Sequence, residues 1–392
     1  MSIINHVEVI DFSYEIPDMG AAFENAHNHV GYLPGGRLQM SKYAIVITSE
    51  DGVRGEYVTQ WGGQRSALQQ TLQLAGDLPG KDSDMREAFY NEWKRRLCHM
   101  DHMGQGPVDI CLWDLAGKEA GKPIYKMLGG YRDKILAYAS TYHGDHTGMF
   151  DSIEAFTDYA QACAEKGYKA FKHHGWFDGN AKQEAELIHA LGKRVGDKMA
   201  LMYDGASDLK TFADAVYVGK ACDGENYYWY EDPYFGSSQS AFAHEKLRGI
   251  IKTPLLITEH VRLLEAKNDF LRAGGTDFLR MDPEYDMGIT GAIKTAHMAE
   301  SFGIDVECHA CGPAQRQLMG AVRNTNFYEL AELGPKLGNI LPHCYADGYR
   351  DEFDSIDQDG YIHIPQGSGL GVVYDWEWLD SHATMRWVFK RT

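Results

Sequence analysis

The chain has 392 residues, enough for two or three domains of about 150 residues or for a barrel of about 250 residues with a smaller domain. Hydrophobic residues make up 44% and charged residues 24%, a balance that excludes disorder as the main state. A net charge of −18 argues against nucleic-acid binding and against docking on an anionic membrane. It does not exclude an anionic small-molecule substrate, because a bound metal ion can reverse the local field.

The apolar and cysteine patterns indicate a cytoplasmic protein. No run of 18 apolar residues is present, so we expect no membrane span. Residues 1–12 lack a basic segment followed by an apolar one, so we expect no signal peptide. The seven cysteines are scattered, which is typical of reduced thiols. Cys308 and Cys311 form a CxxC pair that would suit redox or zinc chemistry, but no second such pair exists.

The first third of the chain mixes strand and helix patterns. The turn residues Glu50-Asp51-Gly52 separate two strand-like runs and predict a hairpin. Apolar residues at helical spacing form one stripe after residue 107, and Gly121 and Pro123 end it. The elements we expect are strands at 3–14, 43–48 and 53–59 and helices at 85–99 and 107–120.

Residues 17–37 contain four glycines and show no periodicity, so we expect a long loop. Loops of that length in a compact domain are usually lids or binding loops. This one carries His27, Asn28 and His29, and we expect His29 to contact a substrate.

From residue 131 onward, short apolar runs alternate with helix-like segments. Eight strands with helical crossovers predict a (β/α)8 barrel with a modified last unit. The expected strands are 135–140, 169–174, 199–204, 227–231, 254–259, 277–282, 304–309 and 325–329. The expected helices are 151–166, 182–195, 209–221, 239–250, 262–273 and 289–302. We therefore divide the chain into an α+β domain (1–130), the barrel (131–340) and a tail that packs back on the first domain (341–392).

Three carboxylates end consecutive predicted barrel strands. Asp204 ends "MALMYD", Glu231 ends "YYWYE" and Glu259 ends "LLITE". Reactive residues of such barrels lie at the carboxyl ends of the strands, so the three side chains should converge at the barrel mouth. Their mutual repulsion would be relieved by a hard cation, and Mg²⁺ suits a site with few carboxylates. The alternative is three separate acidic caps on the following helices.

The second predicted strand ends "AFKHHG" and offers a base. Residues i and i+2 share a face, so Lys172 and His174 should face the cavity while His173 faces the helical layer. We expect the pKa of Lys172 to be lowered by a neighbouring cation and a second base. Either Lys172 or His174 would then be the base, and the sequence leaves that choice open.

A second proton-transfer group lies on the predicted seventh strand. Asp282 ends "FLRMD" and His309 ends "DVECH" on adjacent strands, and an aspartate beside a histidine fixes the imidazole tautomer. Glu329 ends the last strand and would orient a substrate oxygen. Two residues before the dyad lie Arg280 and Glu307, and we expect them to form a buried ion pair beneath it, unless the register is shifted by one.

These residues carry a family resemblance. The chain resembles the enolase superfamily, specifically its mandelate racemase-like subgroup, and the segment "GPVDICLWDLAGKEAGKPIYKMLGG" (106–130) resembles the end of that family's capping domain. The resemblance runs over most of the chain and implies that residues 17–37 are a specificity loop and that the protein is a homo-oligomer. The site residues that it implies are Asp204, Glu231 and Glu259 for Mg²⁺, the Asp282–His309 dyad and the carboxylate of Glu329.

The sequence departs from the family pattern at three places. The family's second strand usually reads Lys-x-Lys, but here it reads Lys172-His173-His174. Arg280 stands where a glutamine is common, and Met287-Gly288 replaces a glycine pair. The first departure leaves the identity of the base on this strand open.

The resemblance implies a Mg²⁺-dependent dehydratase of a sugar acid. The proton α to the carboxylate would be removed and the 3-hydroxyl expelled, giving a 2-keto-3-deoxy acid. Polar residues expected near the mouth suit a polyhydroxy carboxylate substrate, and we assign His29, His143, His260 and Arg280 to substrate binding. The alternatives are a racemase, epimerase or cycloisomerase that uses the same chemistry, and a non-catalytic relative.

Overall fold

Eight parallel strands, to which a ninth strand is added at one place, form the main sheet of the computed structural model, which describes residues 2–20, 30–176 and 178–391. The sheet order is β10-β9-β8-β7-β6-β5-β4-β11, and the neighbouring strands are parallel. At the seam, the backbone N–H of Val306 donates to the carbonyl of Asn324 at 2.8 Å, so the sheet nearly closes into a barrel. The strands are β4 (Lys134–Thr141), β5 (Ala170–His174), β6 (Ala200–Asp204), β7 (Trp229–Glu231), β8 (Leu255–Ile257), β9 (Phe278–Met281), β10 (Asp305–Cys308) and β11 (Phe327–Leu333).

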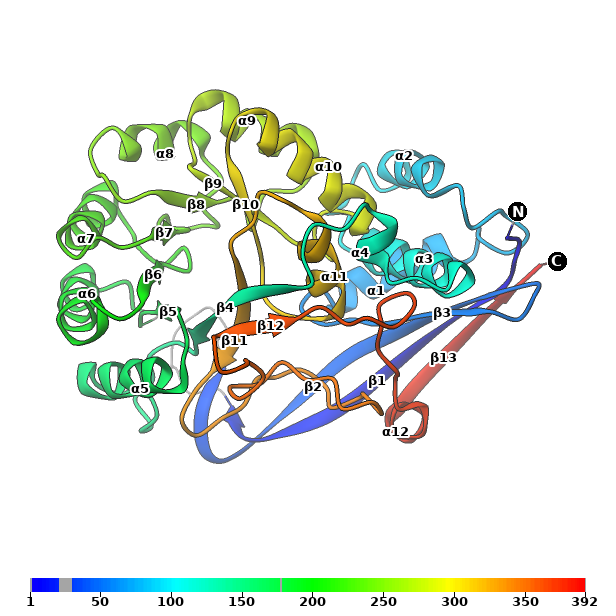
Figure 1. Ribbon diagram of the computed structural model, residues 1–392, viewed down its shortest axis with the longest axis horizontal. Helices are drawn as coiled ribbons and strands as arrows, with labels where there is room; N and C mark the ends of the chain where they lie inside the picture. The colour runs from blue at the N-terminus through cyan, green and yellow to red at the C-terminus, as the bar shows by residue number, and fades with distance from the viewer. Residues whose placement is uncertain (1, 21–29, 177, 392) are drawn as a thin grey trace.

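Helices between these strands cover the outside of the barrel (Figure 1). Local sequence signals fix their ends: Thr211 and Asp214 form a capping box at the start of α7, and Gly167, in a left-handed conformation, ends α5. The helices are α5 (Ile153–Lys166), α6 (Ala181–Val195), α7 (Phe212–Gly224), α8 (Ala241–Arg248), α9 (Leu264–Ala273), α10 (Gly288–Ser301) and α11 (Pro313–Ala321). The (β/α)8-type barrel expected from the sequence is therefore confirmed.

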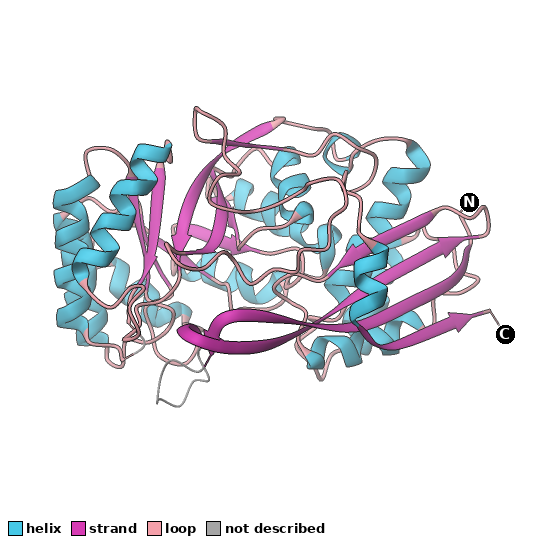
Figure 2. Ribbon diagram, turned by 90° about the horizontal axis from the view of Figure 1, so that it is seen from below, coloured by secondary structure: helices cyan, strands magenta, loops and turns pink. Residues whose placement is uncertain are grey.

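A separate antiparallel sheet has the order β13-β1-β2-β3. Figure 2 shows its two longest strands extending from the chain termini toward the barrel. The strands are β1 (Ile4–Gly20), β2 (Gly31–Ser49), β3 (Arg54–Val58) and β13 (Ala383–Lys390), and the associated helices are α1 (Arg65–Ala75), α2 (Arg86–Arg96), α3 (Gln105–Ala120) and α4 (Ile124–Met127). Gly55 on β3 lies so close to α3 that an added Cβ would be 2.4 Å from the carbonyl oxygen of Cys111, so the sheet packs tightly on this helix.

The loop expected at residues 17–37 is largely strand in the structure. Pro17 pairs with Arg37, Met19 with Tyr32 and Gly20 with Gly31, so β1 and β2 are paired through most of this segment. The expectation was wrong because glycines and a proline in an antiparallel pair of strands obscure the two-residue period. His29 and its neighbours 21–28 lie outside the described residues.

The end of the chain returns to the first sheet. After β12 (Tyr361–His363), which pairs with β4, and α12 (Trp376–His382), strand β13 pairs antiparallel with β1. Within the described residues, no helix combines the length and apolar character needed to cross a membrane.

Candidate active site

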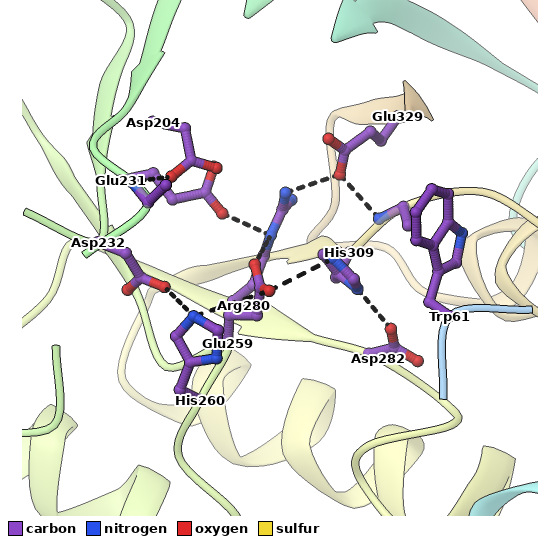
Figure 3. A network of polar contacts seen from close by, with 12 residues as sticks. Trp61, Asp204, Glu231, Asp232, Glu259, His260, Arg280, Asp282, His309 and Glu329 are labelled. Carbon is purple, nitrogen blue, oxygen red and sulfur yellow. Dashed lines mark hydrogen bonds and ion pairs between the residues drawn. The ribbon is translucent and has the colours of Figure 1, made fainter. Parts of the chain in front are cut away.

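A cavity of about 240 Å³ opens at the carboxyl ends of the barrel strands. Of the residues predicted from the sequence, eight line it: Lys172, His174, Asp204, Glu259, His309, Glu329, His143 and His260. Glu231, Arg280 and Asp282 lie just beneath and are at most 2% exposed. The structure therefore brings the predicted site residues that it describes into one region (Figure 3).

The three predicted metal ligands reach this region in two different ways. Asp204 and Glu231 are neighbours across the β6–β7 pairing and follow the two-residue period of their strands. Glu259 breaks that period, because Leu256 on the same strand already faces the barrel interior. Thr258 has a φ of 93°, and this left-handed turn directs the side chain of Glu259 into the cavity.

Two buried cations lie against these carboxylates. Lys172 Nζ is 3.0 Å from Asp204 Oδ2, 3.0 Å from Glu231 Oε2 and 2.9 Å from Glu329 Oε1. Burial opposes the charge of this lysine, but Glu231 and Glu329 outweigh burial and raise its pKa well above the ordinary value. The lowering of the Lys172 pKa was expected beside a bound metal cation, so it stays a prediction.

Arg280 does not form the predicted ion pair with Glu307. Although the two residues are neighbours across the β9–β10 pairing, Arg280 Nη2 lies 2.7 Å from Glu329 Oε2 and Nε lies 2.7 Å from Glu231 Oε1. The Nε contact is an ion pair that lacks good hydrogen-bond geometry. Glu307 instead accepts hydrogen bonds from Asn326, including one of 2.8 Å from its side-chain amide.

The opposite directions of these two side chains explain the error. The guanidinium extends toward the mouth and pairs with Glu231 and Glu329, whereas Glu307 turns toward Asn326, just before the start of β11. Arg280 is fully buried and does not line the cavity. Its predicted contact with substrate therefore has no support in this structure.

The carboxylate cluster suits a hard divalent cation by its chemistry. Asp232 lies beside Glu231, is 2% exposed and has a buried side-chain oxygen, Oδ1, without a hydrogen-bond partner in the part of the chain that the structure describes. Burial, together with the charges of Glu259, Glu231 and Asp204, raises the pKa of Asp232 well above its ordinary value. No group of three or more described histidine, cysteine, aspartate or glutamate side chains is arranged to hold a metal ion as it stands, and Lys172 and Arg280 here neutralise part of the charge. The oxygen-only donor set nevertheless fits Mg²⁺.

His309 and Asp282 form the predicted dyad. Nδ1 of His309 donates to Asp282 Oδ2 at 2.7 Å, which leaves Nε2 directed toward the cavity, 3.4 Å from Glu259 Oε1. Burial lowers the affinity of this imidazole for a proton, but Glu259 and the hydrogen bond to Asp282 outweigh burial and raise its pKa to about 9. His309 can therefore carry a proton at neutral pH.

His174 presents a second imidazole to the same cavity. Its Nδ1 lies 2.7 Å from the carbonyl oxygen of Thr141, and a carbonyl only accepts, so Nδ1 carries a hydrogen and Nε2 faces Asp204 at 3.2 Å. His143 packs against it with ring centroids 4.5 Å apart. His173 is fully buried among the rings of Tyr203, Phe156 and Tyr227, as its outward position predicts.

Sequence reasoning missed several residues of this site. Trp61 comes from the segment after β3 and lies edge-on to His309, with ring centroids 6.1 Å apart. Asp232 and Glu332 both have a positive φ, of 34° and 53°, and both line the cavity. Such strained backbone clusters at active sites, but strand alternation hides it. Only the position of Asp232 directly after a predicted ligand was a usable signal.

Glu284 connects the dyad to the segment that carries Trp61. Its carboxylate accepts hydrogen bonds from the backbone N–H groups of Gln60, Trp61 and Gly62 at 2.8, 2.7 and 2.6 Å. Its own backbone N–H donates to Asp282 Oδ1 at 2.7 Å. One buried residue of the barrel thus holds both the Trp61 segment and the aspartate of the dyad.

Comparisons with known proteins identify the family. Residues 155–378 match the model for the enolase C-terminal domain-like family, and residues 34–129 match the mandelate racemase / muconate lactonizing enzyme N-terminal domain. The chain belongs to the enolase superfamily, in its mandelate racemase-like subgroup.

Individual relatives include sugar-acid dehydratases. A D-gluconate/D-galactonate dehydratase from Picrophilus torridus is 32% identical over 75% of this chain and 74% of its own length. A D-gluconate dehydratase from Thermoproteus tenax is 27% identical over 81% of this chain, which spans 64% of that protein, slightly under two thirds. The structure of D-glucarate dehydratase from Agrobacterium tumefaciens, complexed with magnesium, has a TM-score of 0.82 at 27% identity and covers 98% of this chain and 99% of its own.

Proposed function

We propose that the protein is a Mg²⁺-dependent dehydratase of a sugar acid, which converts a 2,3-dihydroxy carboxylate into a 2-keto-3-deoxy acid. One observation carries the proposal: the imidazoles of His174 and His309 face one cavity from β5 and β10. The three strands that end at the carboxylate cluster lie between β5 and β10 in the sheet order. Two proton-transfer groups thus flank the candidate metal centre, as proton removal beside a carboxylate requires. The dehydratases among the relatives support the same reaction class.

Asp204, Glu231 and Glu259 would hold the metal. A bound Mg²⁺ ion would supply positive charge that stabilises the enediolate form of the substrate carboxylate. Lys172 contacts both Asp204 and Glu231, so it adds fixed positive charge on the inner side of the same centre. Glu329 contacts Lys172 through Oε1 and Arg280 through Oε2 and so keeps both cations in place.

His174 is the better candidate for the base that removes the α-proton. Its contact with the Thr141 carbonyl fixes Nδ1 as the protonated nitrogen, so Nε2 is the atom that gains and loses a proton inside the cavity. Burial opposes the charged imidazole, but Asp204, 3.2 Å from Nε2, outweighs burial and raises the pKa of His174. Lys172 is 1% exposed and lies 2.9 Å from Glu329, which is not one of the proposed metal ligands, so losing its proton would weaken the pairing of that buried carboxylate. We therefore assign proton removal to His174 Nε2 and electrostatic support to Lys172.

His309 then serves as the acid that protonates the leaving 3-hydroxyl. Asp282 holds Nδ1 and stabilises the imidazolium, and Nε2 presents the proton to the cavity. Elimination is completed when the hydroxyl leaves as water and the enol product tautomerises. The same two imidazoles would also suit a racemase, the activity after which the family is named, if His309 protonated carbon instead of oxygen.

The reaction can be tested with purified protein, Mg²⁺ and a panel of sugar acids, with 2-keto-3-deoxy acid as the assayed product. We expect at least one acid to be dehydrated, and we expect a chelator to abolish turnover and added Mg²⁺ to restore it. Glu231→Gln should lose turnover while keeping the barrel's circular dichroism. A product that retains its 3-hydroxyl with inverted configuration at the α-carbon would instead show a racemase.

A further inference from the structure

The charges around the cavity limit which chemical group can lie at the end of the substrate opposite its reacting carboxylate. Of the described residues that line it, Asp204, Asp232, Glu259, Glu329 and Glu332 are acidic, and Lys172 is the only lysine or arginine. Its ammonium group is already held by three carboxylates. The segments outside the described residues add no lysine or arginine, because residues 21–29 read AAFENAHNH and residue 177 is phenylalanine.

Three other nearby cations, Arg280, Lys42 and Arg262, contact protein groups; Arg262 donates to the carbonyl of Glu259 and stacks over the ring of Tyr285. Arg280 is fully buried beneath the cavity and paired with Glu231 and Glu329. Lys42 is 6% exposed and donates to the carbonyl of Gln60, and burial lowers its pKa. Neither Lys42 nor Arg280 lines the cavity. His260 lines it but already lies 3.5 Å from Asp232 Oδ2.

Glu332 gives the cavity a hydrogen-bond acceptor on the side that faces the antiparallel β13-β1-β2-β3 sheet. It follows β11 residue Ala331 with a φ of 53° and lines the cavity, and its Oε2 is buried without a hydrogen-bond partner among the described residues. Burial raises the pKa of Glu332 to about 7, and the nearby His174, Lys42 and His309 favour its ionised form. An unpaired carboxylate oxygen accepts hydrogen bonds from hydroxyl groups and repels a second carboxylate.

We infer that the protein takes a monocarboxylic sugar acid, an aldonate, and rejects the matching dicarboxylic acid, an aldarate, with Glu332 as the residue that receives the hydroxyls of the sugar chain. The inference rests on the proposed dehydratase function. The two positive charges of a bound Mg²⁺ ion would balance the reacting carboxylate of the substrate and part of the negative charge of the protein's own carboxylates. A second substrate carboxylate would then be buried beside acidic side chains without a cation, which is unfavourable.

The experiment compares pairs of acids that differ only at the far carbon. D-Gluconate is compared with D-glucarate, D-galactonate with galactarate and D-mannonate with D-mannarate, each with Mg²⁺. We expect the best aldonate to exceed its aldarate by about 100-fold or more in kcat/KM. A preference for the aldarate would overturn this inference and leave the dehydratase proposal standing. Failure to dehydrate any acid of either class would overturn both.

The role of Glu332 in substrate choice is tested by the ratio of kcat/KM for the aldarate to kcat/KM for the aldonate. A general loss of folded protein lowers both activities equally and leaves this ratio unchanged. Glu332→Lys should raise the aldarate-to-aldonate ratio of kcat/KM by about tenfold or more, because it supplies the missing cation. Glu332→Gln, which removes the charge and keeps the shape, should raise the ratio by less. If both variants keep the wild-type ratio, Glu332 does not contact the substrate chain and the assignment fails.

Discussion

The Nε atom of Arg280 lies 2.7 Å from Oε1 of Glu231 inside the barrel, and neither side chain is exposed. The same guanidinium reaches Glu329 at 2.7 Å. Arg280 therefore neutralises two carboxylates of the candidate active site from beneath, at a position where a solvent cation has no access. It links the stability of the barrel to the electrostatics of the site.

Replacing Arg280 should destabilise the fold strongly. Arg280→Met leaves two buried carboxylates without their partner, and we expect a loss of about 3–5 kcal/mol in the free energy of unfolding, measured by urea denaturation. Arg280→Lys keeps the charge but not both contacts and should lose less. Arg194→Met, at an exposed ion pair with Asp158, should leave the unfolding midpoint almost unchanged. Equal midpoints for Arg280→Met and wild type would contradict the ion-pair account.

Glu284 should affect catalysis without touching substrate. Glu284→Gln puts an amide nitrogen where an oxygen now accepts backbone N–H groups, so the Trp61 segment and the dyad should lose their alignment. We expect kcat/KM to fall by about 10- to 100-fold. The matched control is Glu300→Gln, at an exposed ion pair with Arg323, which should keep full activity. Wild-type activity in Glu284→Gln would remove this residue from the positioning of the site.

Glu184 should make stability depend on pH. It is 1% exposed, accepts a hydrogen bond from the backbone N–H of Trp176 at 2.8 Å, and burial raises its pKa from 4.5 to about 8. Between these values the folded state binds the extra proton, so this contribution to stability is complete below about pH 4.5 and is lost as the pH rises through 8. Glu184→Gln should flatten the decline of unfolding free energy between pH 5 and pH 8. An unchanged slope would mean that Glu184 is ionised in the folded protein.

The roles of Lys172 and His174 can be separated by hydrogen exchange. In D₂O with Mg²⁺ and a substrate acid, His174→Ala should lose exchange of the α-proton because the base is gone. Lys172→Met keeps the base and should retain exchange, at a rate reduced by the loss of positive charge. Proton NMR of the α-position measures both. Retained exchange in His174→Ala with loss in Lys172→Met would assign the base to the lysine.

Much of the site could be predicted from the sequence because parallel strands place their carboxyl ends at one edge. Asp204, Glu231 and His309 follow from strand spacing and the two-residue period alone. Glu259 was predicted from the same rule, yet it reaches the cavity only because Thr258 has a positive φ. A single strained residue can therefore correct a register that strand alternation would assign to the other face.

The contacts that the sequence could not supply all depend on where long side chains point. Arg280 and Glu307 are neighbours in register, as expected, but the arginine extends to the mouth and pairs with residues on β7 and β11. Trp61 reaches the cavity from the segment after β3, and Glu332 reaches it from an irregularity within β11, where its φ is positive. Neither follows from local periodicity, because tertiary packing determines both.

The proposed reaction depends on His174 acting as the base and His309 as the acid, and one measurement tests these two roles most directly. His309→Asn is incubated with a substrate acid and Mg²⁺ in D₂O, and NMR follows the α-proton and the 2-keto-3-deoxy product. We predict that the α-proton still exchanges, because His174 remains, and that no keto acid forms, because the acid for the leaving hydroxyl is missing. Normal formation of the keto acid by this variant would contradict the account.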